Sequence, residues 1–137
     1  MKTFITQHCV RWGDTDPTAD LLYPSLFAIF DDCTWRMFRS VGILPTDMVE
    51  KFSIFGTPMV DTSMHVDNMP QWQDHFDVES QIESFGRSSF KVVHRVLVDQ
   101  KTVVEGREVR VWAAKSDKGD GGLKTVEIPI EVKELFY

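Results

Sequence analysis

The densest chemical signal in this 137-residue chain is a short acidic loop, Asp14-Thr15-Asp16-Pro17-Thr18. Proline disfavours the helical region for the residue before it, so Asp16 is expected to be extended, at the exit of a strand. Tyr23-Pro24 follows and opens a helix, because proline is favoured at the first helical position. A helix N-terminus presents unpaired N–H groups and a partial positive charge. It can polarise a carbonyl oxygen while a neighbouring carboxylate attacks the carbonyl carbon or activates a water, which suits acyl transfer.

The acidic loop has other interpretations. The aspartates can simply bond their own backbone in a turn. Asp14, Asp16 and Thr18 also match the Asp-x-Asp-x-Thr motif of haloacid-dehalogenase-type phosphotransferases, but that motif needs a parallel α/β sheet and a Mg²⁺ site, and short motifs match readily by chance. A calcium loop would need Gly at its sixth position and Glu at its twelfth, and neither is present.

The elements that would position the loop follow an α+β order: one strand, one long helix, then a run of strands. Apolar residues in the helix cover a wide arc, which predicts a helix wrapped by a sheet, and Gly42 is expected to end it. Thr46 is the expected cap of a second, short helix. The expected strands are Phe4 to Trp12, Met59 to Asn68, Phe76 to Phe85, Phe90 to Asp99, Val103 to Ala114 and a short one ending at Ile128-Pro129; the expected helices are Ser25 to Val41, Pro45 to Phe52 and Ile130 to Phe136, with a polar loop from Lys115 to Gly122.

Composition excludes several classes of function. The net charge of −6 argues against a nucleic-acid binder and a polybasic membrane surface, and an anionic substrate would need a local basic cluster. No signal peptide and no apolar stretch of about 20 residues is readable, so a cytoplasmic protein is expected. Cys9 and Cys33 are expected to be free thiols, although a single bridge stays open. The histidines lack ligand spacing, so no metal site is expected.

The chain resembles the 4-hydroxybenzoyl-CoA thioesterase family of hotdog proteins. The resemblance rests on Trp12-Gly13-Asp14-Thr15-Asp16-Pro17, Tyr23-Pro24, Phe30-Asp31, Gly56-Thr57-Pro58, Arg87-Ser88-Ser89-Phe90, Glu108-Val109-Arg110-Val111-Trp112 and Val126-Glu127-Ile128-Pro129. It covers almost the whole chain in the right order. It implies a single α+β hotdog domain over residues 1–137, with a curved antiparallel sheet around the long helix, assembled as homodimers or homotetramers. The implied reaction is hydrolysis of an acyl-CoA thioester, with no cofactor beyond the coenzyme A of the substrate.

The resemblance also implies roles for particular residues. Asp16 is the catalytic carboxylate, as nucleophile or general base, and Tyr23 offers its backbone N–H to the thioester oxygen. Asp14 shapes the loop. The residues expected to contact substrate are Asp31, Thr57, Arg87, Ser88 and Lys124, with Arg87 and Lys124 on the CoA phosphates. Asp31 either meets a polar end of the acyl group or reaches solvent or a partner subunit.

Two departures from the family pattern bear on activity. Ala19-Asp20 stands where the family commonly has Gly-Ile, which places an extra carboxylate near the acyl pocket. The hairpin at residues 85–89 keeps only Arg87 as a cation. An alternative is therefore a hotdog protein that binds acyl-CoA or a related ligand without turning it over.

Overall fold

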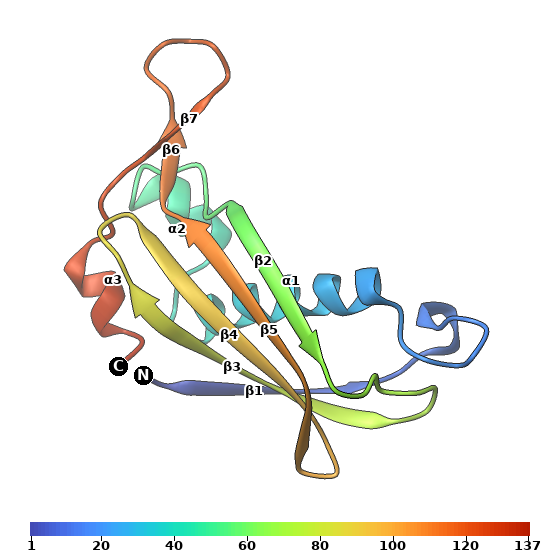
Figure 1. Cartoon of the computed structure of the whole chain (residues 1–137). Coiled ribbons are helices and arrows are strands. Elements are labelled where there is room, and N and C mark those ends of the chain that lie inside the picture. The colour runs from blue at the N-terminus through green and yellow to red at the C-terminus, as the bar shows by residue number, and fades with distance from the viewer.

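A long helix crosses one face of a five-stranded antiparallel sheet in the computed structural model, which describes residues 1–137 (Figure 1). The sheet order is β1-β3-β4-β5-β2, so β1 and β2 form its two edges. The strands are β1 (Thr3–Cys9), β2 (Met59–Val66), β3 (His75–Phe85), β4 (Ser89–Val98) and β5 (Lys101–Val111), and the long helix is α1 (Tyr23–Ser40). This arrangement confirms the α+β hotdog prediction, and its antiparallel sheet rules out the parallel α/β phosphotransferase interpretation.

Helix α1 buries one stripe of side chains against the sheet. Leu26, Phe30, Cys33 and Met37 recur every three or four residues, and all are buried. As predicted, the helix ends at a glycine: Gly42 has a φ of +88°, which a side chain would disfavour. The Gly42 N–H donates to Arg39 O at 2.9 Å and the Ile43 N–H to Phe38 O at 3.0 Å, which satisfies the last carbonyls of the helix.

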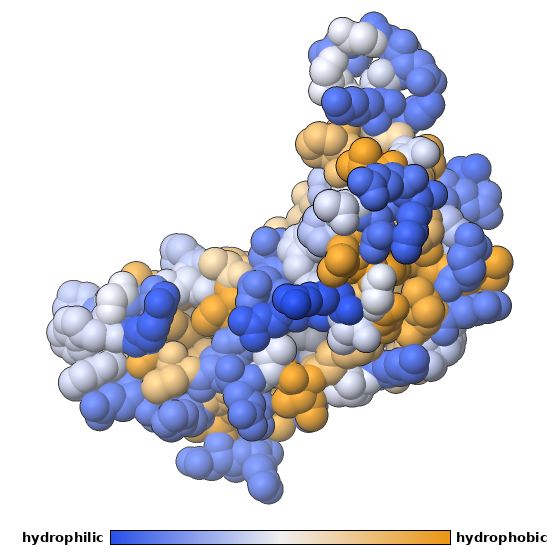
Figure 2. Space-filling model, turned by 180° about the vertical axis from the view of Figure 1, so that it is seen from behind, coloured by the Kyte–Doolittle hydropathy of each residue, from blue (hydrophilic) through white to orange (hydrophobic).

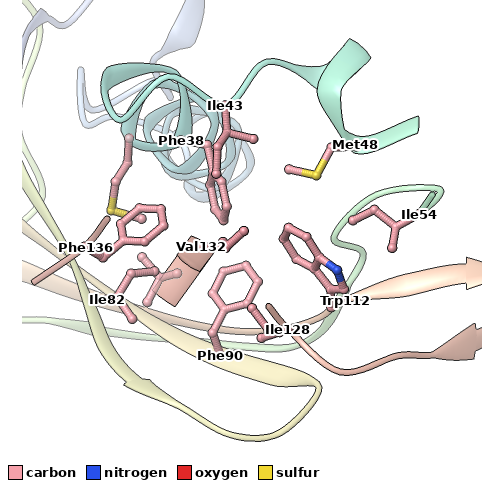
Figure 3. Close-up of a cluster of buried hydrophobic side chains, with 12 residues drawn as sticks. Phe38, Ile43, Met48, Ile54, Ile82, Phe90, Trp112, Ile128, Val132 and Phe136 are labelled. Atoms are coloured by element: carbon pink, nitrogen blue, oxygen red, sulfur yellow. The ribbon is translucent and has the colours of Figure 1, made fainter. Parts of the chain in front are cut away.

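The sheet and α1 enclose a core that the C-terminal segment closes. Figure 3 shows Phe38 of α1, Phe90 of β4 and Phe136 near the C-terminus meeting within one cluster of buried side chains. The ring centroids of Phe38 and Phe136 are 5.1 Å apart, with an angle of 67° between the ring planes. Phe136 follows the short helix α3 (Ile130–Glu134), and its carbonyl accepts the Lys2 N–H at 2.7 Å. The two termini therefore lie side by side (Figure 1).

Several predicted boundaries were wrong for local reasons. Helix α2 (Pro45–Glu50) has Leu44 rather than Thr46 as its N-cap, because the Asp47 carboxylate accepts the Leu44 N–H at 2.8 Å. Trp12 belongs to a short 3-10 helix, η1 (Trp12–Asp14), and not to β1. The last strand, β7 (Leu123–Thr125), ends before the predicted Ile128-Pro129. It pairs with β6 (Ala113–Lys115) in a two-stranded arm that projects from the sheet (Figure 1). No helix has the length and apolarity needed to span a bilayer.

Candidate active site

The acidic loop folds into a tight turn at the end of the sheet where β1 finishes. The Ala19 N–H donates to Asp16 O and the Asp16 N–H to Asp20 O, both at 2.9 Å, with Pro17 and Thr18 between them. Thr15 before the turn is extended, with φ −115° and ψ 156°, and pairs with Leu21 across it. Pro17 suits the second position of such a turn because its ring fixes φ. The turn therefore holds Asp16 at a defined place.

The Asp16 carboxylate is fixed through one of its two oxygens. Asp16 Oδ1 accepts the Thr18 N–H at 2.8 Å, the Thr18 hydroxyl at 2.7 Å and the Asp20 N–H at 3.1 Å. The bond from the Thr18 hydroxyl, helped by the two backbone N–H groups, lowers the pKa of Asp16 below its ordinary value. The carboxylate is therefore ionised at neutral pH, and Oδ2 has no partner within the chain.

The N-terminus of α1 lies in the same segment and is uncapped. Its N-cap, Leu22, has no side chain able to accept a hydrogen bond, and the first turn contains no acidic residue. The Tyr23 N–H has no acceptor within the chain, while the Tyr23 side chain is exposed. An uncapped helix start leaves donors and a partial positive charge available to an incoming carbonyl oxygen.

Asp14 ties the turn to the start of α1. Its carbonyl accepts the Leu22 N–H at 2.9 Å, and its carboxylate accepts bonds from Arg11 Nε at 3.0 Å and Ser25 Oγ at 3.3 Å. Both Asp14 oxygens are thus occupied by neighbours on either side of the loop. This agrees with the expectation that Asp14 shapes the loop.

The structure brings Asp31 and Thr57 together through a residue to which sequence reasoning gave no role. Arg110 Nη2 donates to Asp31 Oδ1 at 2.6 Å, and Arg110 Nη1 donates to the Thr57 carbonyl at 3.1 Å. The Thr57 hydroxyl is buried and has no partner. Asp31 has a half-exposed side chain, whereas that of Arg110 is only 4% exposed. The available signal was the spacing of Glu108 and Arg110, which puts two charges on the same face of a strand.

Behind Arg110 lies a buried polar chain between α1 and the sheet. Glu108 accepts bonds from Arg110 Nε and from the Thr34 hydroxyl, both at 2.8 Å, and lies 3.3 Å from His94 Nε2. The other ring nitrogen of His94 is 2.7 Å from Ser80 Oγ. Burial alone would raise the pKa of Glu108, but the bonds and charges of His94 and Arg110 outweigh it and lower the pKa to about 2.

The residues expected to hold CoA phosphates lie at the other end of the sheet. Arg87 follows β3, whose eleven residues run from the acidic-loop end, so it stands about 30 Å from that loop. Arg87 Nε is 3.7 Å from Glu127, and Lys124 Nζ is 2.6 Å from Asp117. The Ser88 carbonyl accepts the Trp112 N–H at 2.8 Å. One chain therefore does not bring Asp16 close to Arg87, Ser88 and Lys124.

Lys124 stands at the rim of a cavity at the base of the β6–β7 arm. The cavity has a volume of about 880 Å³ and is lined by apolar side chains that include Phe52, Phe55 and Trp112. Figure 2 shows that the tip of the arm is hydrophilic and that hydrophobic residues gather where the arm joins the body. Neither Asp16 nor Tyr23 lines this cavity.

The chain contains no cluster of three or more His, Cys, Asp or Glu side chains arranged to hold a metal ion. Both cysteines are free thiols, with Cys9 exposed and Cys33 buried.

An antiparallel sheet wrapped around one long helix defines the hotdog fold. Residues 10–136 match the sequence model of the thioesterase-like superfamily, so the chain belongs to that superfamily and is a thioesterase. It is 25% identical over 140 residues to the 4-hydroxybenzoyl-CoA thioesterase of Pseudomonas sp. strain CBS-3, covering 98% of this chain and 97% of that one. The resemblance predicted from the motifs is thereby confirmed.

Solved structures share the fold of this chain. The structure of the Pseudomonas sp. strain CBS-3 4-hydroxybenzoyl-CoA thioesterase has a TM-score of 0.88 at 26% identity and covers 98% of this chain and 99% of that one. An aspartate-to-asparagine variant of a 4-hydroxybenzoyl-CoA thioesterase, complexed with 4-hydroxybenzoyl-CoA, has a TM-score of 0.88 at 24% identity over the full length of both chains. A gentisyl-coenzyme A thioesterase shares the fold, with a TM-score of 0.79 at 21% identity and coverage of 97% and 98%.

Proposed function

We propose that the protein hydrolyses an acyl-CoA thioester to a free acid and CoA, with Asp16 as its catalytic carboxylate. The observation that carries the proposal is the Asp16 carboxylate, ionised and with Oδ2 unbonded, in the same loop as an uncapped helix start. Membership of the thioesterase-like superfamily supports the reaction type. The CoA part of the substrate is proposed from the relative named 4-hydroxybenzoyl-CoA thioesterase.

The geometry suits two forms of the reaction. In one, Asp16 Oδ2 attacks the thioester carbon, the C–S bond breaks, CoA leaves as its thiolate, and water hydrolyses the acyl–aspartyl anhydride. In the other, Asp16 takes a proton from a water whose oxygen attacks the same carbon, and the C–S bond then breaks. In both, negative charge develops on the thioester oxygen, and the free Tyr23 N–H at the helix start would stabilise it.

For the acyl group, we propose an aryl or similar group with a polar end that meets Asp31. Arg110 occupies Asp31 Oδ1, while Oδ2 is unbonded and the side chain is 51% exposed. A carboxylate held in this way can accept a hydrogen bond from a hydroxyl on the substrate. The buried, unpartnered Thr57 hydroxyl lies in the same region, since the Thr57 carbonyl shares the Arg110 guanidinium.

We further propose that a complete site needs two copies of the chain. Arg87 and Lys124 are cations at the end of the sheet far from Asp16, and an acidic protein needs such local cations to hold the CoA phosphates. A second copy would bring them to the first copy's Asp16. The unpaired edge of β2 offers a surface for that assembly.

The experiment is a thiol-release assay with acetyl-, hexanoyl-, benzoyl- and 4-hydroxybenzoyl-CoA. Asp16→Asn should lower kcat by about 10²–10⁴-fold with little change in substrate affinity, because the amide keeps the shape and lacks the charge. Asp14→Asn is the matched control in the same loop and should retain more activity. Near wild-type kcat in folded Asp16→Asn would contradict the proposal. Binding of every CoA ester without thiol release would favour the alternative of a ligand-binding protein.

A further inference from the structure

We propose that Thr18 is a positioning residue that fixes the Asp16 carboxylate and leaves Oδ2 as its reactive oxygen, and that Asp20 and Gln71 anchor the turn that carries both. The proposal rests on the proposed role of Asp16 and deepens it. It assigns a purpose to Thr18 and to the Ala19-Asp20 pair that follows it, in which this chain departs from the family pattern.

The geometry around Asp16 Oδ1 supports the positioning role of Thr18. Thr18 donates twice to that one oxygen, through its N–H at 2.8 Å and its hydroxyl at 2.7 Å, and the Asp20 N–H adds a third bond at 3.1 Å. Bonds from several directions to one oxygen restrict rotation of the whole carboxylate, while Oδ2 receives none. The oxygen free to attack a carbonyl carbon or take a proton from water is therefore always Oδ2, and it needs no reorientation during the reaction.

The contact between Asp20 and Gln71 supports their role as the anchor of the turn. Gln71 Nε2 donates to Asp20 Oδ1 at 3.0 Å, and the two residues also form a backbone bridge. The Leu21 N–H donates to Pro70 O at 2.9 Å and the Trp72 N–H to Ala19 O at 2.8 Å. The turn is thus bonded at three successive residues to the segment that leads into β3.

Backbone strain in the turn agrees with this anchoring. Ala19 has a φ of +66°, a conformation that residues with a side chain rarely adopt. Such a conformation persists only where surrounding contacts hold it in place. Here the Ala19 N–H bonds to Asp16 O and the Ala19 carbonyl accepts the Trp72 N–H, so both sides of the strained residue are fixed. The extra carboxylate of Asp20, which accepts the hydrogen bond from Gln71 Nε2, helps to hold the loop.

The charged groups around the turn define how activity should depend on pH. Asp14, Asp20 and Arg11 belong to the same segment as Asp16, and Asp74 belongs to the facing segment, where its carboxylate accepts the Gln71 N–H at 2.8 Å. Arg11 is already bonded to Asp14. The hydrogen bond from the Thr18 hydroxyl, with those from the Thr18 and Asp20 N–H groups, lowers the pKa of Asp16 and outweighs desolvation, which raises it. Removing the Thr18 hydroxyl should therefore raise the pKa of Asp16.

The test compares Thr18→Val with Thr18→Ser, using the best substrate of the acyl-CoA panel. Valine keeps the shape and the backbone N–H but lacks the hydroxyl, whereas serine retains it. Thr18→Val should lower kcat by about 10-fold, as expected for loss of a hydrogen bond to a charged group, and move the acidic limb of the kcat/KM profile to higher pH. Thr18→Ser should keep the wild-type kcat and the wild-type position of the acidic limb. Circular dichroism and urea unfolding would establish that the variants are folded.

The outcomes separate this proposal from the one on which it rests. If Asp16→Asn is active, the proposed function fails. If Asp16→Asn is inactive while folded Thr18→Val keeps the wild-type kcat and acidic limb, the positioning role of Thr18 is overturned and the role of Asp16 stands. Gln71→Met tests the anchor by removing the Nε2 donor at nearly constant shape. It should lower kcat with KM unchanged, and a wild-type kcat would overturn the anchor.

Discussion

Arg110 joins the sheet to helix α1 by donating its Nη2 to Asp31 Oδ1 at 2.6 Å. The two side chains differ in environment, because that of Arg110 is 4% exposed and that of Asp31 is 51% exposed. The buried guanidinium is also bonded to Glu108 and to the Thr57 carbonyl. One cation thus holds both a half-exposed carboxylate, proposed to meet substrate, and a buried carboxylate.

Replacing Arg110 by methionine should destabilise the fold strongly. The change leaves Glu108 as a buried charge without its arginine partner, and breaking a buried ion pair in this way typically costs about 3–5 kcal/mol in the free energy of unfolding. Arg95→Met is the control, because Arg95 pairs with Glu105 at 3.6 Å on the surface and such pairs contribute about 0–1 kcal/mol. Urea denaturation measures both. Equal losses for the two variants would show that the buried network does not stabilise the fold.

Glu108 should make stability depend on acid pH. Its pKa is lowered from 4.5 to about 2 in the folded chain, so the folded state binds fewer protons than the unfolded state between these values. The resulting stabilisation, on the order of 3 kcal/mol, is present above about pH 4.5 and is lost as the pH falls towards 2. Glu108→Gln cannot titrate. The difference in unfolding free energy between wild type and Glu108→Gln should therefore shrink from pH 7 to pH 3, and a constant difference would contradict the assignment.

Gly106 should not tolerate a side chain. An added Cβ would overlap the ring of Phe30, and Phe30 in turn stacks on His94 with ring centroids 4.8 Å apart. Gly106→Ala should therefore cost about 1–3 kcal/mol by displacing the helix from the sheet. Gly13→Ala is the control, because nothing lies within 4 Å of its added Cβ. Thermal unfolding of the two variants provides the measurement, and an unchanged midpoint for Gly106→Ala would contradict the predicted overlap.

The sequence predicted helices and strands well where the hydrophobic periodicity agrees with the positions of proline and glycine. Pro24 and Gly42 mark the two ends of α1 because both act through the local backbone. The buried network was not predicted, because Glu108, Arg110 and Asp31 meet only after β5 is placed beneath α1. The Thr46 cap was wrong because the helix begins one residue earlier, at Pro45, so that Thr46 lies within its first turn and Leu44 is the N-cap.

The candidate site was predictable only in part for the same physical reason. Asp16 and Tyr23 lie seven residues apart, so local chain geometry alone keeps them in one loop. The bond from Gln71 to Asp20 spans fifty-one residues and depends on tertiary structure. Likewise, the distance that separates Arg87 from Asp16 depends on the length and direction of β3.

The chain should assemble into a homodimer or homotetramer through the β2 edge. Val60 on this strand is 60% exposed, and its neighbours Phe55 and Met59 are also exposed. Together they form an apolar surface at an unpaired sheet edge. Val60→Lys should shift the protein towards monomer in sedimentation velocity at micromolar concentration. Ile5→Lys is the control, because Ile5 is equally exposed on the opposite edge strand, β1. A wild-type protein that sediments as a monomer would contradict the prediction.

Arg87 should contribute to substrate affinity more than to the chemical step. Its side chain is 74% exposed and stands 3.7 Å from Glu127, far from Asp16 along the sheet, so it can attract phosphate without approaching the thioester. Arg87→Ala should raise KM for the best acyl-CoA substrate more than it lowers kcat, and the penalty should shrink in high salt because ions screen exposed charges. Glu127→Gln should lower KM, since it removes the carboxylate that competes for the guanidinium. Lys101→Ala, at the β4–β5 turn, removes one exposed positive charge elsewhere and should leave KM nearly unchanged. If Arg87→Ala and Lys101→Ala have the same effect, Arg87 acts only through net charge and the phosphate site lies elsewhere.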